Sequence, residues 1–218
     1  MTDFKAKAKE AEDCYDFRNL AEEILDSDSG DQNFARKMYQ KAIEKAEDST
    51  DYRNCAESIA NEDFLGDKDW ARDVFKMAFE EPMVSIDYMF SAKAIANKNC
   101  LNDKDWARDV FKMAVKEAMV SEDYRLCAED IADDNYLADK DWAREVFKMG
   151  IEEAENSYEL DEIANSIGEC LGDKEWAREV LEMAVDMAEN SDELDNAAYF
   201  IEECLGDKKW AKEVRSKK

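Results

Sequence analysis

The 218-residue chain contains no histidine, one proline and only six glycines. Without histidine, imidazole acid–base catalysis, His-activated nucleophiles and His-ligated zinc are excluded. The scarcity of proline and glycine removes the usual helix breakers. The residues that abound, such as Ala, Glu, Lys, Leu and Met, are strong helix formers. The composition therefore predicts an all-α protein.

Long apolar runs, CxxC pairs and glycine-rich phosphate loops are also missing. No apolar run approaches the about 20 residues that a membrane span needs, and from the polar first residues we expect no secretory leader. Cys55 and Cys127 occupy one repeated apolar position, and Cys100, Cys170 and Cys204 occupy another. This placement favours small buried thiols in a reducing compartment over a disulfide framework. We expect a cytoplasmic protein that binds no membrane, metal or cofactor.

Positive charge is in short supply, because 30 Lys and Arg residues face 56 Asp and Glu residues, a formal net charge of −26. Such a surface repels nucleic acid and anionic membranes and attracts basic partners. Apolar residues still make up 45% of the chain, which is enough for a continuous core. We therefore expect no direct binding of nucleic acid. The expected partner is another protein with a basic surface or segment.

One motif, LNDKDWARDVFKMA from Leu101, recurs along the chain with small changes. Successive tryptophans of the motif lie 36, 36, 34 and 34 residues apart, at Trp70, Trp106, Trp142, Trp176 and Trp210. A weaker copy from Gly30 carries Phe34 in the tryptophan position. A period of this length is typical of stacked helical repeats, in which each repeat contacts mainly its neighbours.

Each repeat contains two amphipathic helices. In the unit that starts at Ser121, this serine is the expected N-cap of the first helix, and Ser157 has the same role in the next unit. Asp139 is expected to cap the second helix. The apolar stripe of the first helix consists of Tyr124, Cys127, Ala128 and Ile131. The stripe of the second helix consists of Ala143, Val146, Phe147 and Gly150.

This periodicity predicts one repeat array over residues 1–218. Residues 1–13 form an amino-terminal capping helix, and residues 191–218 form a truncated carboxy-terminal unit. The full units between them span about residues 15–49, 50–84, 85–120, 121–156 and 157–190.

The helix patterns resemble those of tetratricopeptide repeats. Such first helices carry a large, a medium, a small and a large residue at steps of three, one and three, which Tyr124, Cys127, Ala128 and Ile131 match. Their second helices carry a small, an aromatic and a small residue, as do Ala107, Phe111 and Ala114. Asp103 and the long inner loop look most like the Sel-one-like branch, although the double glycine of that branch is absent. The resemblance implies a right-handed α-solenoid of helix-turn-helix repeats, and it implies no particular activity.

In tetratricopeptide-like arrays the first helices line the concave face, which is the usual binding surface. Two positions of each first helix would then face a partner: the residue after the first large apolar position, and the residue four further on. The first set is Arg18, Arg53, Met89, Arg125, Asp161 and Asp195. The second set is Glu22, Glu57, Lys93, Glu129, Asn165 and Tyr199. The alternative is that these charges are solvated and form i,i+4 pairs, for example Arg53 with Glu57.

Two other features each have a structural and a functional interpretation. The tryptophans either seal the inner loops between helices or form an aromatic row that grips a peptide. The acidic surplus either keeps the molecule soluble or mimics nucleic acid. The acidic run Asp26–Asp31 lacks the glutamate of a calcium loop and is interpreted as a capped turn.

We therefore expect a non-catalytic protein-interaction module that docks a partner on its concave face and is a monomer outside its complex. The alternative is an acidic decoy that mimics nucleic acid and inhibits a basic nucleic-acid-binding protein, for example a defence-system effector. A third class, a structural oligomer that stacks end to end, is disfavoured by the charged termini.

Overall fold

A computed structural model of the chain describes residues 4–28 and 30–217. Residues 1–3 of the expected capping helix, Ser29 of the acidic run and Lys218 of the last unit lie outside the described residues. The described residues form thirteen α-helices and two short π-helical segments, without a strand. The all-α prediction is thus confirmed. The chain divides into two compact units, residues 1–110 and 111–218.

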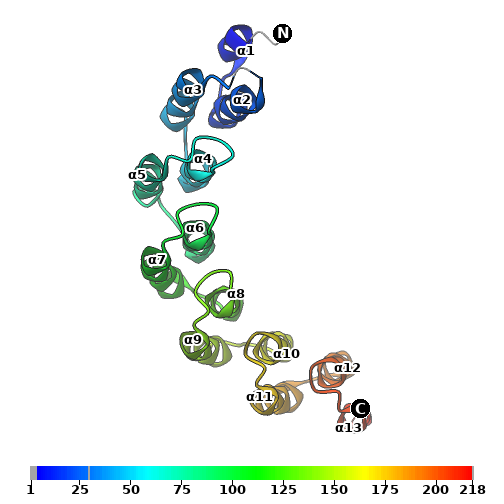
Figure 1. Cartoon of the computed structure of the whole chain (residues 1–218). Coiled ribbons are helices and arrows are strands. Elements are labelled where there is room, and N and C mark those ends of the chain that lie inside the picture. Colours follow the sequence, from blue (N-terminus) through cyan, green and yellow to red (C-terminus); the bar gives the residue numbers. More distant parts are fainter. Residues whose placement is uncertain (1–3, 29, 218) are drawn as a thin grey trace. The chain divides into compact units, whose positions relative to one another are not determined.

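Unit 1 consists of consecutive helices that pack in pairs. α2 packs on α3 and α4 packs on α5, and α2, α4 and α6 form one row in Figure 1. We call the first and second members of each pair the first helix and the second helix. The helices of unit 1 are α1 (Phe4–Glu10), α2 (Cys14–Asp26), α3 (Gln32–Glu44), α4 (Ser49–Ala60), α5 (Lys68–Ala78), α6 (Ser85–Ala96) and the first half of α7 (Lys104–Glu117).

Unit 2 repeats this arrangement. α8 packs on α9, α10 on α11 and α12 on α13. Together with unit 1, this confirms a chain of paired helical repeats. After the second half of α7, the elements of unit 2 are α8 (Ser121–Ala132), α9 (Lys140–Glu152), α10 (Ser157–Ser166), η1 (Ile167–Leu171), α11 (Lys174–Met187), α12 (Ser191–Phe200), η2 (Ile201–Leu205) and α13 (Lys208–Arg215).

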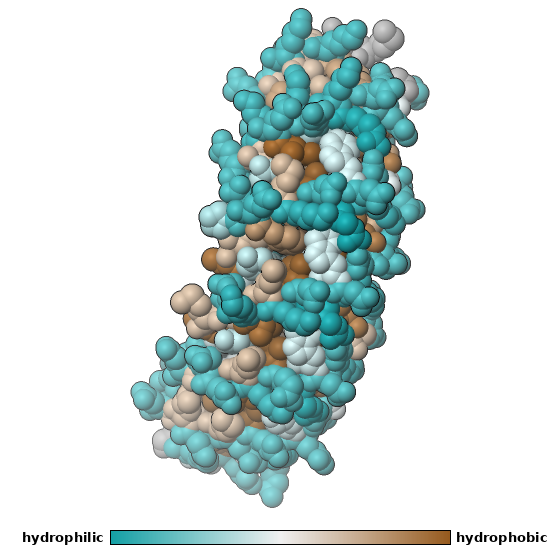
Figure 2. Space-filling model, turned by 90° about the vertical axis from the view of Figure 1, so that its left-hand side faces the viewer, coloured by the Kyte–Doolittle hydropathy of each residue, from teal (hydrophilic) through white to brown (hydrophobic). Residues whose placement is uncertain are grey.

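The core lies between the two helices of each pair. Ile59 of α4 and Phe75 of α5 are fully buried, and Ile131 of α8 and Phe147 of α9 occupy the same positions in unit 2. Small residues such as Ala71 bring the helices close, and the burial of these apolar stripes is the main stabilising contribution. Between bands of hydrophilic side chains, the side shown in Figure 2 still exposes brown and pale patches.

A contact of three side chains joins the second helix α5 to the next second helix, α7. Asp103 caps α7, because its Oδ1 accepts the backbone N–H of Trp106 at 3.0 Å. Its Oδ2 accepts a 2.7 Å hydrogen bond from Arg72 of α5. The Arg72 guanidinium also lies 4.9 Å from the Trp106 ring centroid, and this ring packs edge-on against Phe75. We call this contact the Asp–Trp–Arg clamp.

The Asp–Trp–Arg clamp recurs in both units. The arginine–aspartate distance is 2.6 Å in each of the pairs Arg36–Asp67, Arg144–Asp173 and Arg178–Asp207. The backbone N–H of the tryptophan, and then the arginine, lower the pKa of each capping aspartate. The same guanidinium groups lie over the rings of Trp70, Trp176 and Trp210. These contacts support the structural interpretation of the tryptophans.

The predicted caps are right for the second helix and wrong for the first. Asp139 accepts the backbone N–H of Trp142 at 3.0 Å, as expected. Ser121 is not the N-cap, because Val120 occupies the N-cap position of α8 without a side-chain hydrogen bond, and Ser157 follows the true cap, Asn156. Both serines are buried in the first turn instead. The N-cap position of both helices thus lies one residue earlier than predicted.

The turn between the two helices explains why the period falls from 36 to 34 residues. In the shorter repeats the first helix continues into a π-helical segment, η1 or η2, which replaces the turn of the longer repeats. In both the longer and the shorter repeats, the residue directly before the capping aspartate has a positive φ angle. Gly66 has φ 61° and Gly172 has φ 72°, but Ala138 has φ 56° at the same position. Ala138 is therefore strained, because a Cβ atom disfavours this conformation.

The buried thiols largely follow the expectation. Cys14, Cys55, Cys100 and Cys127 are buried, and Cys170 and Cys204 are half-buried. The structure also brings the Cys14 and Cys55 Sγ atoms to 3.5 Å, although 41 residues separate them. This hydrogen bond, together with burial, raises the pKa of the Cys55 thiol.

Replacing Ala138 by glycine should stabilise the protein by about 1 kcal/mol, because glycine adopts positive φ without a steric penalty. The free energy of unfolding in urea would measure the effect. Gly172→Ala is the matched control and should destabilise by a similar amount. Loss of stability in Ala138→Gly would contradict the strain at this turn.

Trp106→Ala should destabilise the protein by about 2 kcal/mol, less than for a fully buried tryptophan, because the ring is half-buried between Arg72 and Phe75. Trp106→Phe should cost less, since Phe34 serves in this position of the first repeat. Urea unfolding of both variants provides the measurement. If Trp106→Ala were as stable as the parent, the tryptophans would not hold the repeats together.

Candidate interaction surface

All twelve partner-binding positions expected from the sequence lie on first helices. Glu57 and Tyr199 are exposed, whereas Met89 and Asp161 are buried. The remaining eight are half-buried, and they are Arg18, Glu22, Arg53, Lys93, Arg125, Glu129, Asn165 and Asp195. Much of this first-helix face is thus occupied by contacts within the protein.

In unit 1, Arg18 and Glu22 link α2 to its neighbour. Arg18 Nε lies 3.7 Å from a Glu22 carboxylate oxygen, and the guanidinium lies 5.3 Å from the Tyr15 ring centroid. The Ser58 hydroxyl of α4 donates a 2.6 Å hydrogen bond to the same Glu22 oxygen. The i,i+4 pair expected as the alternative is therefore present, and it also joins two repeats.

Phe90 is the most prominent feature of this face in unit 1. Its side chain is 43% exposed, although it belongs to α6. The Arg53 guanidinium lies 5.2 Å from the Phe90 ring centroid, and the Lys93 ammonium lies 5.9 Å from it. Met89, by contrast, is only 5% exposed. Sequence reasoning missed Phe90 because it assigned the outward position one residue too early.

In unit 2, an ion-pair cluster surrounds Arg125, which occupies the same repeat position as Arg53. Arg125 Nη1 donates to Glu129 at 2.7 Å, and its Nη2 lies 3.3 Å from Glu162 of α10. Ser166 donates a 2.6 Å hydrogen bond to Glu129. The Arg125 side chain is only 16% exposed, so these pairs are partly shielded from solvent. This cluster therefore joins α8 to α10.

Asp161 is fully buried between α10 and α12. Its Oδ2 accepts a 2.8 Å hydrogen bond from the Asn196 amide, and its Oδ1 is buried without a hydrogen-bond partner. Burial is the largest effect on this carboxyl and raises its pKa to about 7. The sequence suggested a solvated acid at this position. The structure shows a buried acid, which offers no surface to a partner.

An acid-rich cleft of about 480 Å³ adjoins the Arg125 cluster in unit 2. Five carboxylates line it and Lys140 is the single basic residue. The lining residues are Glu129, Asp130, Ala132, Asp133, Asp134, Lys140, Glu169 and Cys170. No group of three Cys, Asp or Glu side chains in residues 4–28 and 30–217 has the geometry of a metal site.

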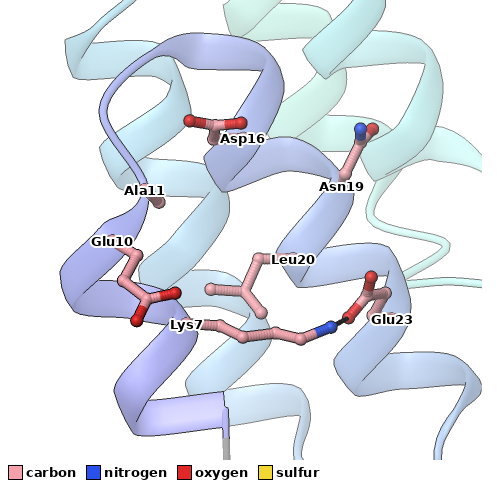
Figure 3. Close-up of a pocket in the computed structure, with 7 residues that line it drawn as sticks. All are labelled: Lys7, Glu10, Ala11, Asp16, Asn19, Leu20 and Glu23. Carbon is pink, nitrogen blue, oxygen red and sulfur yellow. Dashed lines mark hydrogen bonds and ion pairs between the residues drawn. The ribbon is translucent and has the colours of Figure 1, made fainter.

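A smaller cavity of about 280 Å³ lies between α1 and α2 (Figure 3). Lys7 extends along it beneath Leu20 and forms an ion pair with Glu23. Asp16 lies at the other end, where its carboxylate accepts the backbone N–H of Glu12 at 3.1 Å. The charged groups thus join the first two helices to each other.

Comparison of the chain with protein-family models, with curated proteins and with solved structures gave no match. Among the helices of the described residues, none combines the length and the apolar character of a membrane span.

Asp161→Asn should stabilise the protein at high pH. Because the folded-state pKa of about 7 lies above the ordinary value, the acid contributes fully to stability below about pH 4 and loses this contribution as the pH rises through 7. At pH 8 the parent should therefore be less stable than Asp161→Asn by up to about 4 kcal/mol, and the difference should shrink toward pH 4.

Urea unfolding between pH 4 and pH 8 would test this dependence. Asp186→Asn, at an exposed position of α11, is the control and should show no comparable change with pH. An equal difference at both pH values would mean that folding does not raise the pKa of Asp161.

Proposed function

We propose that the chain is a non-catalytic, cytoplasmic protein-interaction module, built from tetratricopeptide-like, Sel-one-like repeats in a right-handed solenoid. A peptide or a folded partner docks on the first-helix face. The partner is a protein with a basic surface or segment, and the module is a monomer outside its complex.

Phe90 is the observation that carries this proposal. Buried aromatic and arginine side chains supply much of the binding energy of protein interfaces. Phe90 is an aromatic ring left 43% exposed, and Arg53 and Lys93 hold it in place, so little side-chain freedom would be lost on binding. In unit 2, Tyr199 is 53% exposed and packs edge-on against Phe200. Both are aromatic anchors on first helices.

The distribution of charge supports a basic partner. Residues 149–207 contain 19 Asp and Glu but only two Lys and Arg, so this segment has a net charge of 2 − 19 = −17 out of −26. The acid-rich cleft beside Glu129 opens within unit 2, in the same half of the chain. Long-range attraction would therefore steer a basic segment toward unit 2, whereas aromatic contacts would fix it in place.

The same concentration of acid favours the second candidate, an acidic decoy that occupies the nucleic-acid site of a basic protein. Affinity would then come almost entirely from charge, and it would fall steeply as salt increases. A docking module with aromatic anchors would lose less affinity in salt.

Affinity capture with the immobilised protein from its native lysate would distinguish the two. At about 0.5 M salt, where charges are screened beyond a few ångströms, the docking module should retain its partner. The double variant Arg53→Ala and Phe90→Ala, and separately Tyr199→Ala, should weaken capture about tenfold.

Lys76→Ala, on an exposed position of a second helix, is the control and should bind like the parent. Complete release of the partner by salt or by duplex DNA, with no effect of the aromatic variants, would favour the decoy. If no protein were captured at either salt concentration, both functions would be wrong.

A further inference from the structure

A second cavity, of about 590 Å³ and widely open to solvent, lies between α1 and α3 in unit 1. Its volume falls within the range of about 300–1,000 Å³ that is typical of small-molecule sites. Ala8, Phe34 and the buried Met38 form its apolar part. The end of the molecule that carries α1 and α3 shows a tan patch enclosed by hydrophilic side chains in Figure 2.

Four lysines surround this apolar part. Lys5 and Lys9 are four residues apart on α1, and Lys37 and Lys41 are four residues apart on α3. Each pair therefore lies on one side of its helix, and the two pairs border the cavity from facing helices. Lys41 Nζ also lies 5.0 Å from the Phe17 ring centroid. Glu44 is the single acidic residue in the lining, although acids outnumber bases 56 to 30 in the chain.

The first repeat departs from the later repeats at several positions, and three of those that line this cavity change its charge or the size of its aromatic residue. Lys37 stands where the later repeats have an acid, namely Asp73, Asp109, Glu145 and Glu179. Lys41 stands where they have a methionine, namely Met77, Met113, Met149 and Met183. Phe34 replaces the larger tryptophan. The lining of the cavity therefore has four lysines against one acidic residue.

We propose that the cavity between α1 and α3 binds a small amphiphilic anion: an apolar chain or ring that carries a carboxylate, sulfonate or phosphate group. The apolar portion packs on Phe34 and Met38, and the lysines bind the anionic group. Four lysines and one glutamate line the cavity, so a bound anionic group meets an excess of positive charge there. This site is separate from the first-helix face.

Titration with 11-(dansylamino)undecanoate, a fluorescent long-chain carboxylate, tests the proposal in the full-length protein. The parent should bind one equivalent, and laurate should displace the probe. Acetate, which lacks the chain, and dodecanol, which lacks the charge, should displace it at least about tenfold less well. Binding should also protect the protein against thermal unfolding.

The variant Lys37→Asp with Lys41→Met restores the residues that the next repeat carries at these positions, and it should therefore fold. Its affinity for the probe should fall by at least about tenfold. Phe34→Trp keeps all four lysines but fills the cavity, and it should weaken binding to a similar extent. Lys76→Met removes an exposed lysine of α5 and should leave binding unchanged.

Circular dichroism would establish that each variant is folded. Parent-like affinity in both the lysine variant and Phe34→Trp would overturn the site. Equal displacement by dodecanol and laurate would show that the lysines do not select an anion, and this would overturn the proposal as well. Neither result would affect the capture experiment, because the first-helix face is unchanged in these variants.

Discussion

The stability of each unit depends on how one helical pair holds the next. Apolar burial between stripes is non-directional, so by itself it would let neighbouring helices slide. The Asp–Trp–Arg clamp supplies direction, because Asp103 must cap α7 and accept from Arg72 at the same time. A charge-assisted hydrogen bond beside a cation–π contact fixes both distance and orientation. Because each first helix packs on its second helix, the clamp also fixes how neighbouring first helices lie relative to each other within a unit.

This registration also explains why the expected binding face is only partly free. Glu22 accepts from Ser58 and Glu129 accepts from Ser166, each one repeat further along the chain. Most of the charged side chains are thus half-buried, with Glu57 exposed, whereas the rings of Phe90 and Tyr199 remain available. On this face, a partner would contact exposed aromatic rings, whereas many of the charged side chains already form ion pairs or hydrogen bonds within the protein.

The sequence was sufficient for the helices, their pairing and the Asp139 cap, because these depend on patterns within about 15 residues. The sequence did not predict the contacts between residues that lie one repeat apart. The contacts Arg72–Asp103 and Asp161–Asn196 join positions 31 and 35 residues apart, and no local sequence pattern predicts them. Asp161 looked like a solvated acid, and Ser121 looked like a cap, because burial against a neighbouring repeat is invisible within a single helix.

The clamp has a polarity that bears on how such a chain can change in length. In four pairs an arginine donates to an aspartate of the following repeat, so a repeat such as the one with Asp67 and Arg72 carries one acceptor for its predecessor and one donor for its successor. Excision of one whole period by recombination would join a donor to an equivalent acceptor, whereas excision of a fraction would leave one of them alone. Genes for such proteins can therefore grow and shrink in complete modules without redesign of the junctions.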